Sequence, residues 1–265
     1  MKFDIIIGNP PYQAPGGTQT GRTIWDKFVA RSLELISDGG SLVYINPPRW
    51  RQPTDRLERI YKDNQLVFCW MYTVKEGMKT FGACTNYDVY QIQKVPPTQP
   101  TRFRYYDGTR GEADASVLPM IPNMNMDWWL KAFADKGPKL EVICTHTHSP
   151  DRKHCAREQD DNFRFPFIHK LSGKGVEICY TNREHKYQGQ TKIAFRDQGK
   201  PWATVTTDGC GSHTYFILGD NPEVISFLNS DQYKRVVESA TFSHRQINYK
   251  SLRYIPLGMV LPANK

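Results

Sequence analysis

Apolar residues in the first hundred positions fall into short continuous runs, separated by a stretch with helical spacing. The run Phe-Asp-Ile-Ile-Ile-Gly at 3–8 predicts a strand buried on both faces, as in a parallel sheet. Within 23–36, large apolar residues recur near one face at helical spacing and predict an amphipathic helix. Later patterns predict strands at 41–45, 66–72 and 87–94 and a helix near 54–63. This order, β-α-β-α-β-β, is typical of the later half of a doubly wound α/β domain.

The pattern changes at the proline-rich stretch Val95–Pro100, which we expect to be a domain boundary. Beyond it, the predicted elements are shorter, with glycine-rich turns and scattered aromatic residues. They are strands at 175–181, 191–196, 201–207 and 214–218, and a helix at 222–237 that opens with proline. We therefore expect two domains, an α/β domain over residues 1–97 and an α+β domain over residues 98–265.

The composition is that of a globular protein with a basic surplus. Of 265 residues, 39% are hydrophobic, and 35 Lys and Arg against 27 Asp and Glu give a net charge of +8. This balance permits a polyanionic partner. No apolar run approaches the roughly 18 residues of a membrane span, and Asp4 interrupts any signal-peptide core, so we expect a cytoplasmic chain with no membrane contact. Six cysteines without tight pairing fit reduced thiols better than a disulfide framework.

The clearest chemical signal is the tetrapeptide Asn9-Pro10-Pro11-Tyr12, which directly follows the first predicted strand. Two prolines fix a rigid turn at the carboxyl end of that strand, where α/β proteins bind ligands. The Asn9 side-chain oxygen and the Pro10 carbonyl oxygen then form two fixed hydrogen-bond acceptors, and the Tyr12 ring offers a flat stacking surface beside them. A purely structural prolyl loop is the alternative.

This arrangement resembles the catalytic motif of the amino-group DNA methyltransferases, specifically those that methylate the exocyclic nitrogen of adenine. In that family the target base is flipped out of the duplex, and its amino group donates hydrogen bonds to the asparagine oxygen and the first proline carbonyl. The two acceptors localise the nitrogen lone pair, which attacks the methyl group of S-adenosylmethionine in line. The resemblance implies S-adenosylmethionine as cofactor, catalytic roles for Asn9, Pro10, Pro11 and Tyr12, and stacking of Tyr12 on the base.

Two further regions extend the resemblance. Phe81 precedes a strand that begins Asn-Tyr-Asp-Val, where the family often places a second aromatic residue against the flipped base. Phe81 is therefore a second stacking candidate, with a core position as the alternative. Three later segments look like the target-recognition region of restriction-modification enzymes: Gly219–Pro222, Phe227–Ser230 and Ile247–Leu252. The resemblance implies the later half of a Rossmann-like methyltransferase sheet, followed by an α+β target-recognition domain that binds double-stranded DNA.

One part of the family pattern is missing. These enzymes carry a cofactor-binding strand, its glycine-rich turn and a helix before the Asn-Pro-Pro-Tyr segment, whereas eight residues precede Asn9 here. The strand at 3–8 would normally pair with that strand, so Ile5, Ile6 and Ile7 are expected to lie on an open apolar edge. We favour a partner subunit that carries the glycine-rich half. A truncated product of a longer reading frame and a non-catalytic DNA-recognition subunit are the alternatives.

Basic residues mixed with aromatic and amide side chains are the candidate DNA contacts. Lys and Arg can neutralise phosphates, and Arg and Asn can read base edges, although each cluster taken alone is more often a solvated face. The candidates are Arg49, Arg51, Arg183, Lys186, His244, Arg245, Asn248 and Lys250.

The segment from Cys144 to Cys155 contains two cysteines and three histidines, the ligand types that zinc prefers. Their spacing matches no standard finger pattern, and charged residues lie between them. We therefore expect a polar loop and no metal.

The sequence as a whole predicts an adenine-specific DNA methyltransferase of restriction-modification type, active either alone or only with a partner chain, in a bacterial, phage or viral context. A methyltransferase-derived DNA-binding or assembly subunit without activity is the alternative. A methyltransferase acting on protein glutamine or on RNA would use the same acceptor chemistry, but the long, basic and aromatic C-terminal region favours DNA.

Overall fold

A computed structural model of the chain describes residues 2–14, 23–53, 57, 59–145, 154–172, 175–196, 202–211, 214–242 and 247–260. The chain divides into two compact units. The first unit comprises Met1–Met126 and Ala240–His244, and the second comprises Asp127–Ser239 and Arg245–Lys265. No helix among the described residues is long and apolar enough to span a bilayer.

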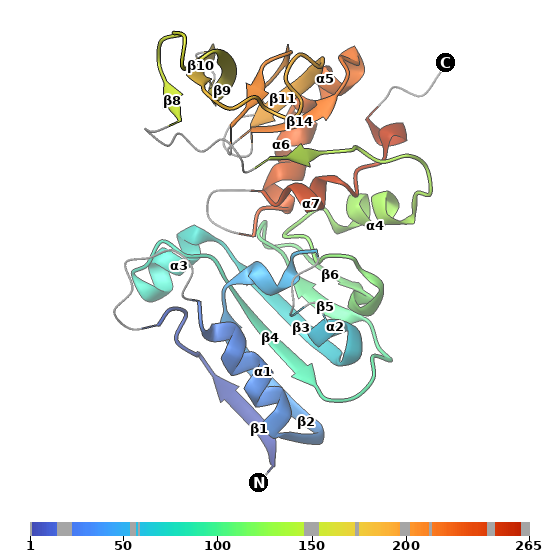
Figure 1. Cartoon of the computed structure of the whole chain (residues 1–265). Coiled ribbons are helices and arrows are strands. Elements are labelled where there is room, and N and C mark those ends of the chain that lie inside the picture. The colour runs from blue at the N-terminus through green and yellow to red at the C-terminus, as the bar shows by residue number, and fades with distance from the viewer. Residues whose placement is uncertain are drawn as a thin grey trace. The chain divides into compact units, whose positions relative to one another are not determined.

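The first unit is built on a six-stranded sheet with the strand order β1-β2-β4-β3-β5-β6 (Figure 1). Its elements are β1 (Phe3–Gly8), α1 (Trp25–Leu35), β2 (Ile36–Asn46), the 3-10 turn η1 (Pro48–Arg51), α2 (Arg59–Asp63), β3 (Gln65–Tyr72), α3 (Val74–Phe81), β4 (Tyr87–Gln93), β5 (Thr101–Arg104), β6 (Arg110–Ala113) and η2 (Ala115–Val117). β1 and β2 are parallel, and β4 runs antiparallel to both of its neighbours, β2 and β3.

One face of this sheet is covered by helices. A row of cross-strand neighbours runs over it through Gly8, Tyr44, Tyr90, Cys69, Phe103 and Gly111. The hydroxyl of Tyr44 lies 2.6 Å from that of Ser32 in α1, and the Trp50 ring of η1 packs against Tyr90 with 4.5 Å between ring centroids. Figure 1 shows α1 and α2 on the same side of the sheet. We call this side the covered face.

The opposite side carries the next row of cross-strand neighbours: Ile7, Val43, Gln91, Phe68, Arg102 and Glu112. None of these six side chains is buried, whereas Tyr44, Tyr90, Cys69 and Phe103 on the covered face all are. Because successive side chains on a strand point to opposite faces, every strand of the sheet separates a packed side from an accessible one. We call the accessible side the open face.

β1 lies at the edge of the sheet, which bears on two predictions. The prediction that this strand is buried on both faces is wrong, since Ile5 is 62% and Ile7 is 75% exposed. Both faces of a parallel strand are covered only where helices pack on each side of the sheet, whereas Ile5 and Ile7 lie on the open face, in the edge strand of the described sheet. In the described sheet β1 is an edge strand, with Ile5 and Ile7 exposed and Ile6 half-buried.

The domain boundary expected at residues 97/98 lies inside the first unit. After the proline-rich turn, β5 pairs in parallel with β3, and β6 pairs with β5, so both strands extend the same sheet. The unit continues to Met126. The predicted helix at 23–36 is confirmed as α1, which ends one residue earlier because β2 already begins at Ile36.

The second unit contains two four-stranded sheets, ordered β13-β9-β10-β8 and β12-β11-β14-β7. Ile168 and Leu171 from one sheet share a buried cluster with Ala194 and Phe216 from the other. The four predicted strands are present, but the helix predicted at 222–237 is two helices. The elements are α4 (Met126–Ala134), β7 (Ile143–Cys144), β8 (Cys155–Ala156), β9 (Phe165–Ser172), β10 (Gly175–Thr181), β11 (Lys192–Arg196), β12 (Ala203–Thr206), β13 (Gly209–Cys210), β14 (Thr214–Leu218), α5 (Pro222–Leu228), α6 (Asp231–Ser239), α7 (Tyr249–Leu252) and η3 (Leu257–Met259).

Candidate functional site

The Asn-Pro-Pro-Tyr segment leaves the sheet at the carboxyl end of β1. A Cβ atom at Gly8 would lie 3.0 Å from the Tyr44 ring, so glycine lets the strand pass close to that ring immediately before the motif. Pro10 is buried, whereas Asn9 is exposed, and no residue in the described part of the chain hydrogen-bonds the Asn9 side chain. The amide of Asn9 is therefore available to a ligand.

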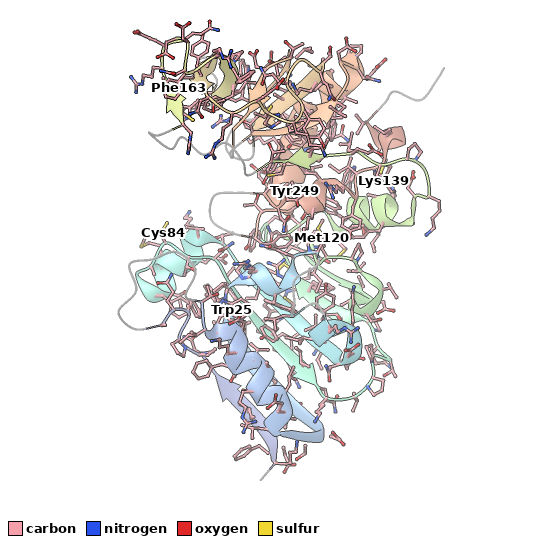
Figure 2. All side chains as sticks on the ribbon, viewed as in Figure 1. Trp25, Cys84, Met120, Lys139, Phe163 and Tyr249 are labelled. Atoms are coloured by element: carbon pink, nitrogen blue, oxygen red, sulfur yellow. The ribbon has the colours of Figure 1, made fainter. Side chains whose placement is uncertain are left out.

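The backbone around Tyr12 is held by the start of α1. The carbonyl of Tyr12 accepts a hydrogen bond of 3.2 Å from the Ile24 amide, and Gln13 forms an isolated antiparallel bridge with Thr23. Figure 2 shows Trp25, the first residue of α1, at the end of the helix toward which β1 runs. These contacts fix the backbone on the far side of the diproline turn.

The Tyr12 side chain is partly buried, and its hydroxyl has no hydrogen-bond partner among the described residues. Burial raises the pKa of this hydroxyl to about 12, and the nearby Asp88 and Tyr87 contribute to the rise. Tyr12 therefore stays protonated at neutral pH. This fits a ring that stacks and does not fit a catalytic base.

Phe81 lies beside an aromatic cluster at the same end of the sheet. Its ring meets that of Tyr87 edge-on at 4.9 Å, Tyr87 stacks on Tyr72 at 4.6 Å, and the Arg104 guanidinium lies 4.7 Å from the Tyr72 centroid. Tyr87 is a neighbour of both Phe81 and Tyr12. Phe81 is 40% exposed, so the alternative of a core position does not describe it.

Phe81 is positioned by α3, a helix that the sequence reasoning missed. Thr73 and Glu76 form a reciprocal capping box at its start, and Glu76 also accepts a 2.8 Å hydrogen bond from Arg104. A Cβ atom at Gly77 would lie 1.8 Å from the Thr85 carbonyl oxygen, so only glycine permits this packing. The signal that could have found the helix is the Thr-x-x-Glu pattern at 73–76.

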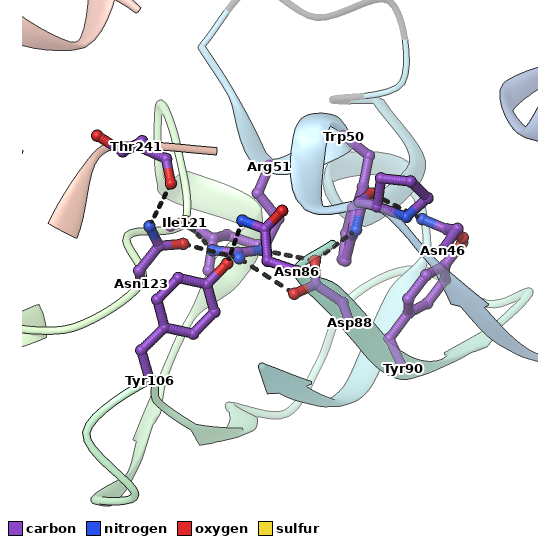
Figure 3. A network of polar contacts seen from close by, with 11 residues as sticks. Asn46, Trp50, Arg51, Asn86, Asp88, Tyr90, Tyr106, Ile121, Asn123 and Thr241 are labelled. Atoms are coloured by element: carbon purple, nitrogen blue, oxygen red, sulfur yellow. Dashed lines mark hydrogen bonds and ion pairs between the residues drawn. The ribbon is translucent and has the colours of Figure 1, made fainter. Parts of the chain in front are cut away.

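Arg51, predicted to bind DNA, is instead the centre of a buried network (Figure 3). Its guanidinium forms a bidentate pair with Asp88, with contacts of 2.7 and 3.1 Å, and donates 2.8 Å hydrogen bonds to the Ile121 carbonyl and the Asn123 side chain. The Trp50 indole donates to the same carboxylate at 2.8 Å. The side chain has no exposed surface, so Arg51 is a structural residue and does not reach a phosphate.

Opposing effects act on the Asp88 carboxyl. Burial raises its pKa, and the Arg51 guanidinium and the Trp50 indole oppose the rise by favouring the charged form. The network continues through Asn123, whose amide donates to the Thr241 carbonyl at 2.8 Å. It therefore ties η1 and β4 to the Ala240–His244 segment within the first unit.

The remaining predicted DNA contacts are accessible to different degrees. Arg49 is exposed at η1, and Arg183 and Lys186 are exposed after β10. Arg183 donates a 2.7 Å hydrogen bond to the His154 ring, and the Lys186 ammonium lies 5.3 Å from the Tyr187 centroid.

The fourth predicted cluster spans the start of α7. Asn248 caps this helix, accepting a 3.0 Å hydrogen bond from the Lys250 amide, and both side chains are partly exposed. His244 and Arg245 lie outside the described residues. The second unit contains Arg183, Lys186, Arg245, Asn248 and Lys250, whereas His244 belongs to the first unit.

No group of three or more His, Cys, Asp or Glu side chains in the described ranges is arranged to hold a metal ion. Cys144 and Cys155 lie in strands of different sheets, and His146 and His148 of the predicted polar loop lie outside the described residues. Around Tyr12, the neighbouring carboxylate is Asp88, which is occupied by Arg51 and Trp50. In the described part of this corner, the carboxylate beside Tyr12 is therefore already engaged by protein groups.

Comparisons with known proteins connect the first unit to restriction-modification enzymes. Residues 1–72 match the family model described as Eco57I restriction-modification methylase. No curated protein sequence matches the chain. Among solved structures, the type IIL restriction-modification enzyme MmeI, determined in complex with DNA, matches with a TM-score of 0.57 at 9% identity, covering 95% of this chain and 46% of that chain. The type IIG restriction endonuclease BpuSI matches with a TM-score of 0.37 at 10% identity, covering 95% and 46%.

The chain thus spans less than half the length of these solved chains. The likeness to MmeI shows a shared mixed α/β fold, and the family match supports a restriction-modification methyltransferase. Both findings agree with the expectation from the sequence of an α/β protein that resembles restriction-modification methyltransferases.

Proposed function

We propose that this chain methylates the exocyclic amino group of adenine in DNA, with S-adenosylmethionine as the methyl donor. The observation that carries the proposal is Asn9, which follows β1 at its carboxyl end with an exposed amide that no described residue engages. Ligands of α/β proteins bind at this end of the sheet, and the match of residues 1–72 to a restriction-modification methylase supports the assignment.

Asn9 and Pro10 act on the nucleophile. The Asn9 side-chain oxygen and the Pro10 carbonyl accept the two amino hydrogens of the base, which draws the nitrogen toward tetrahedral geometry and localises its lone pair. Both acceptors stand on a turn that Pro10 and Pro11 make rigid, so little reorganisation is needed at the moment of reaction. Neither residue forms a covalent bond with the substrate.

Tyr12 and Phe81 hold the ring of the flipped base. An extrahelical base needs apolar or aromatic contacts to replace the stacking that it loses in the duplex. Tyr12 is fixed by the start of α1, and Phe81 is presented by α3 against Tyr87. The partial exposure of both rings leaves surface for such contact.

S-adenosylmethionine supplies an electrophilic methyl group when bound, and part of its site lies beside Asn9. A polypeptide that carries a glycine-rich strand–turn–helix would complete it. The edge of β1 supports this role for a partner, because an apolar edge strand with unpaired backbone groups is a template for a further strand. Pairing there would place the partner's turn beside Asn9.

Contacts to double-stranded DNA come from the exposed basic residues. Arg49, Arg183 and Lys186 are accessible, and Asn248 and Lys250 are partly so. Phosphate contacts of this kind set affinity and its salt dependence. Neutralising Arg245 and Lys250 together is expected to weaken binding and to flatten the salt dependence.

The test is transfer of a labelled methyl group to duplex DNA by the chain with and without candidate partners. Transfer with the partner, and its loss in Asn9→Ala, supports the proposal. A chain that binds the methyl donor tightly by itself overturns the requirement for a partner. A second candidate is a methyltransferase-derived subunit that reads or assembles on DNA without catalysis, which the exposed Arg49, Arg183 and Lys186 also support. DNA binding without transfer under any pairing would select it.

A further inference from the structure

The helix α3 carries an apolar stripe that the protein leaves partly uncovered. Val74, Met78 and Phe81 follow one another at i, i+4 and i+7, so they lie along one side of the helix. Met78 is 50% and Phe81 is 40% exposed, and Val74 is half-buried. An amphipathic helix normally turns such a stripe toward a core. Here part of the stripe is open to a ligand.

A different side of α3 meets the rest of the first unit. Gly77 leaves room for the Thr85 carbonyl, and the hydroxyl of Thr80 lies 3.2 Å from that of Tyr87. At 3.6 residues per turn, Met78 lies about 160° around the helix axis from Thr80. The exposure of Met78 therefore follows from how the helix is fixed against the segment before β4.

Two lysines adjoin the apolar stripe. Lys75 and Lys79 are exposed and lie one helical turn apart, next to Met78. Glu76 is paired with Arg104 at 2.8 Å, so its charge is offset. No salt bridge among the described residues involves either lysine. The helix thus presents two positive charges beside an apolar side chain, which suits a ligand with charged phosphates and apolar bases.

α3 lies at the same end of the sheet as Asn9. β1 and β2 run in parallel toward this end, where Asn46 of β2 pairs with Asp88 at the start of β4. α3 connects β3 to β4 and so stands at this end (Figure 1). Its last residue, Phe81, is the second stacking candidate for the flipped base. Met78 is three positions earlier, which places the two Cβ atoms about 5–6 Å apart.

A base that leaves the duplex opens a gap in the stack. Proteins that deform DNA often fill such a gap with an apolar side chain, and methionine adapts well to an irregular space. Met78 is an exposed apolar side chain one turn away from the candidate base site. A second copy of this chain is a less suitable occupant, because an isologous contact between two α3 helices would bring their lysines together.

We propose that α3 contacts double-stranded DNA beside the flipped adenine: Met78 enters the gap that the base leaves, and Lys75 and Lys79 contact the adjacent phosphates. This rests on the part of the proposed function in which the adenine leaves the duplex. The capping box and the glycine contact hold the helix in place, so its backbone needs little ordering when DNA binds.

The test measures DNA affinity in the absence of the methyl donor. A duplex that the full chain binds tightly is selected from a random pool, and each adenine in it is replaced in turn by an abasic site. The position at which the replacement strengthens binding is that of the flipped base, because the cost of unstacking the base is removed. The intact duplex, this abasic duplex and an unrelated duplex of equal length are the three probes.

Met78→Ala is expected to weaken binding of the intact and the abasic duplex about 10-fold, as for the loss of a buried methionine side chain. It is expected to leave the unrelated duplex unchanged, since no gap forms there. Met78→Leu keeps the apolar volume and is expected to bind all three probes like the wild type. Phe81→Ala is expected to weaken binding of the intact duplex alone, because the abasic duplex has no base to stack.

Lys75→Gln and Lys79→Gln are each expected to reduce the slope of log affinity against log salt by about 0.9, on all three probes alike. Lys94→Gln is the matched control, because Lys94 follows β4 at the opposite end of the sheet. Unchanged slopes in the two α3 variants overturn the phosphate contacts.

Val117→Ala is the matched control for Met78→Ala, because Val117 is an exposed apolar residue in η2. Met78 is half-exposed and alanine favours a helix, so thermal unfolding is expected to stay unchanged and to exclude misfolding. No binding of DNA by the wild type, no adenine whose removal strengthens binding, or an equal loss on the unrelated duplex overturns the proposal. Self-association that Met78→Ala abolishes while DNA affinity is unchanged also overturns it.

Failure here and failure of the proposed function give different results. If Met78→Ala shows the expected losses while no methyl label enters DNA, the contact by α3 stands and the catalytic proposal fails. If label enters DNA while Met78→Ala binds all three probes normally, the catalytic proposal stands and the contact by α3 fails.

Discussion

The first unit contains the tripeptide Asn-Pro-Pro twice, after each of its two parallel neighbouring strands. Asn46, at the end of β2, is fully buried, accepts a 2.8 Å hydrogen bond from the Tyr90 hydroxyl and donates one of 3.1 Å to the Pro47 carbonyl. Asn9, at the end of β1, is exposed, and no described residue engages its side chain. The same tripeptide therefore forms a buried, hydrogen-bonded turn at the end of β2, which we call the structural corner. At the end of β1 it forms an accessible turn, which we call the open corner.

The position of each strand in the sheet explains the difference. β2 has neighbours on both sides, so Asn46 lies opposite Asp88 of β4 and beneath the buried Tyr90. Among the described strands β1 is at the edge of the sheet, and β2 is its one neighbour there. A short motif thus acquires its chemistry from what surrounds the end of its strand. The four predictions below test this distinction.

The largest effect is expected from Arg51→Ala, beside the structural corner. The substitution leaves the Asp88 carboxylate buried without its bidentate partner, which costs about 3–5 kcal/mol of folding stability. Urea denaturation measures the loss. Arg49→Ala, two residues away and exposed, is the matched control and is expected to change stability by about 0.5 kcal/mol or less. A small effect of Arg51→Ala would mean that the hydrogen-bond network around Asp88 does not stabilise the structural corner at Asn46.

Asn9→Ala is expected to affect catalysis and leave stability unchanged. Removing one of two preorganised acceptors lowers kcat by about 10²–10³-fold, while the melting temperature stays that of the wild type because no described residue bonds the side chain. Single-turnover methyl transfer to duplex DNA measures the first, and thermal unfolding the second. Gln13→Ala, exposed in the same loop, controls for general disturbance of the turn. A variant that unfolds early but transfers normally would place Asn9 with Asn46 as a structural residue.

The sequence predicts well those features that depend on nearby residues. The strands β1, β3 and β4 and the helix α1 follow from local patterns and lie where these patterns indicate. The proline-rich turn before β5 has the sequence of a domain boundary, but the chain returns to the same sheet after it, and a turn looks the same in either case.

The burial of side chains depends on distant residues and was predicted less well. The sequence predicts the same DNA-contact role for Arg51 as for Arg49, because both stand beside Trp50. Its true partner, Asp88, lies 37 positions away and becomes visible only when β4 is placed next to β2. The same holds for Ile7, whose exposure is decided by the open face on which it lies and not by its own apolar character.

Asn46→Ala sharpens the comparison by inverting the result expected for Asn9. The Tyr90 hydroxyl loses its acceptor in a fully buried position, which costs about 1–3 kcal/mol of stability. A double-mutant cycle with Tyr90→Phe is expected to show that the two substitutions together cost less than their sum. Chemical denaturation gives these values. If Asn46→Ala kept full stability but abolished methyl transfer, the two corners would have exchanged roles.

The smallest effect is expected from Tyr12→Phe. The Tyr12 hydroxyl has no partner among the described residues, so its removal changes stability by about 0.5 kcal/mol or less. Because burial raises its pKa to about 12, the hydroxyl is protonated throughout the neutral range, and the pH profile of methyl transfer is expected to match that of the wild type. Tyr12→Ala, which removes the ring, is the contrasting variant and is expected to weaken base binding by about 1–3 kcal/mol. Equal losses in the phenylalanine and alanine variants would assign the function of Tyr12 to its hydroxyl, and the open corner would then contribute a third polar group beside Asn9 and Pro10.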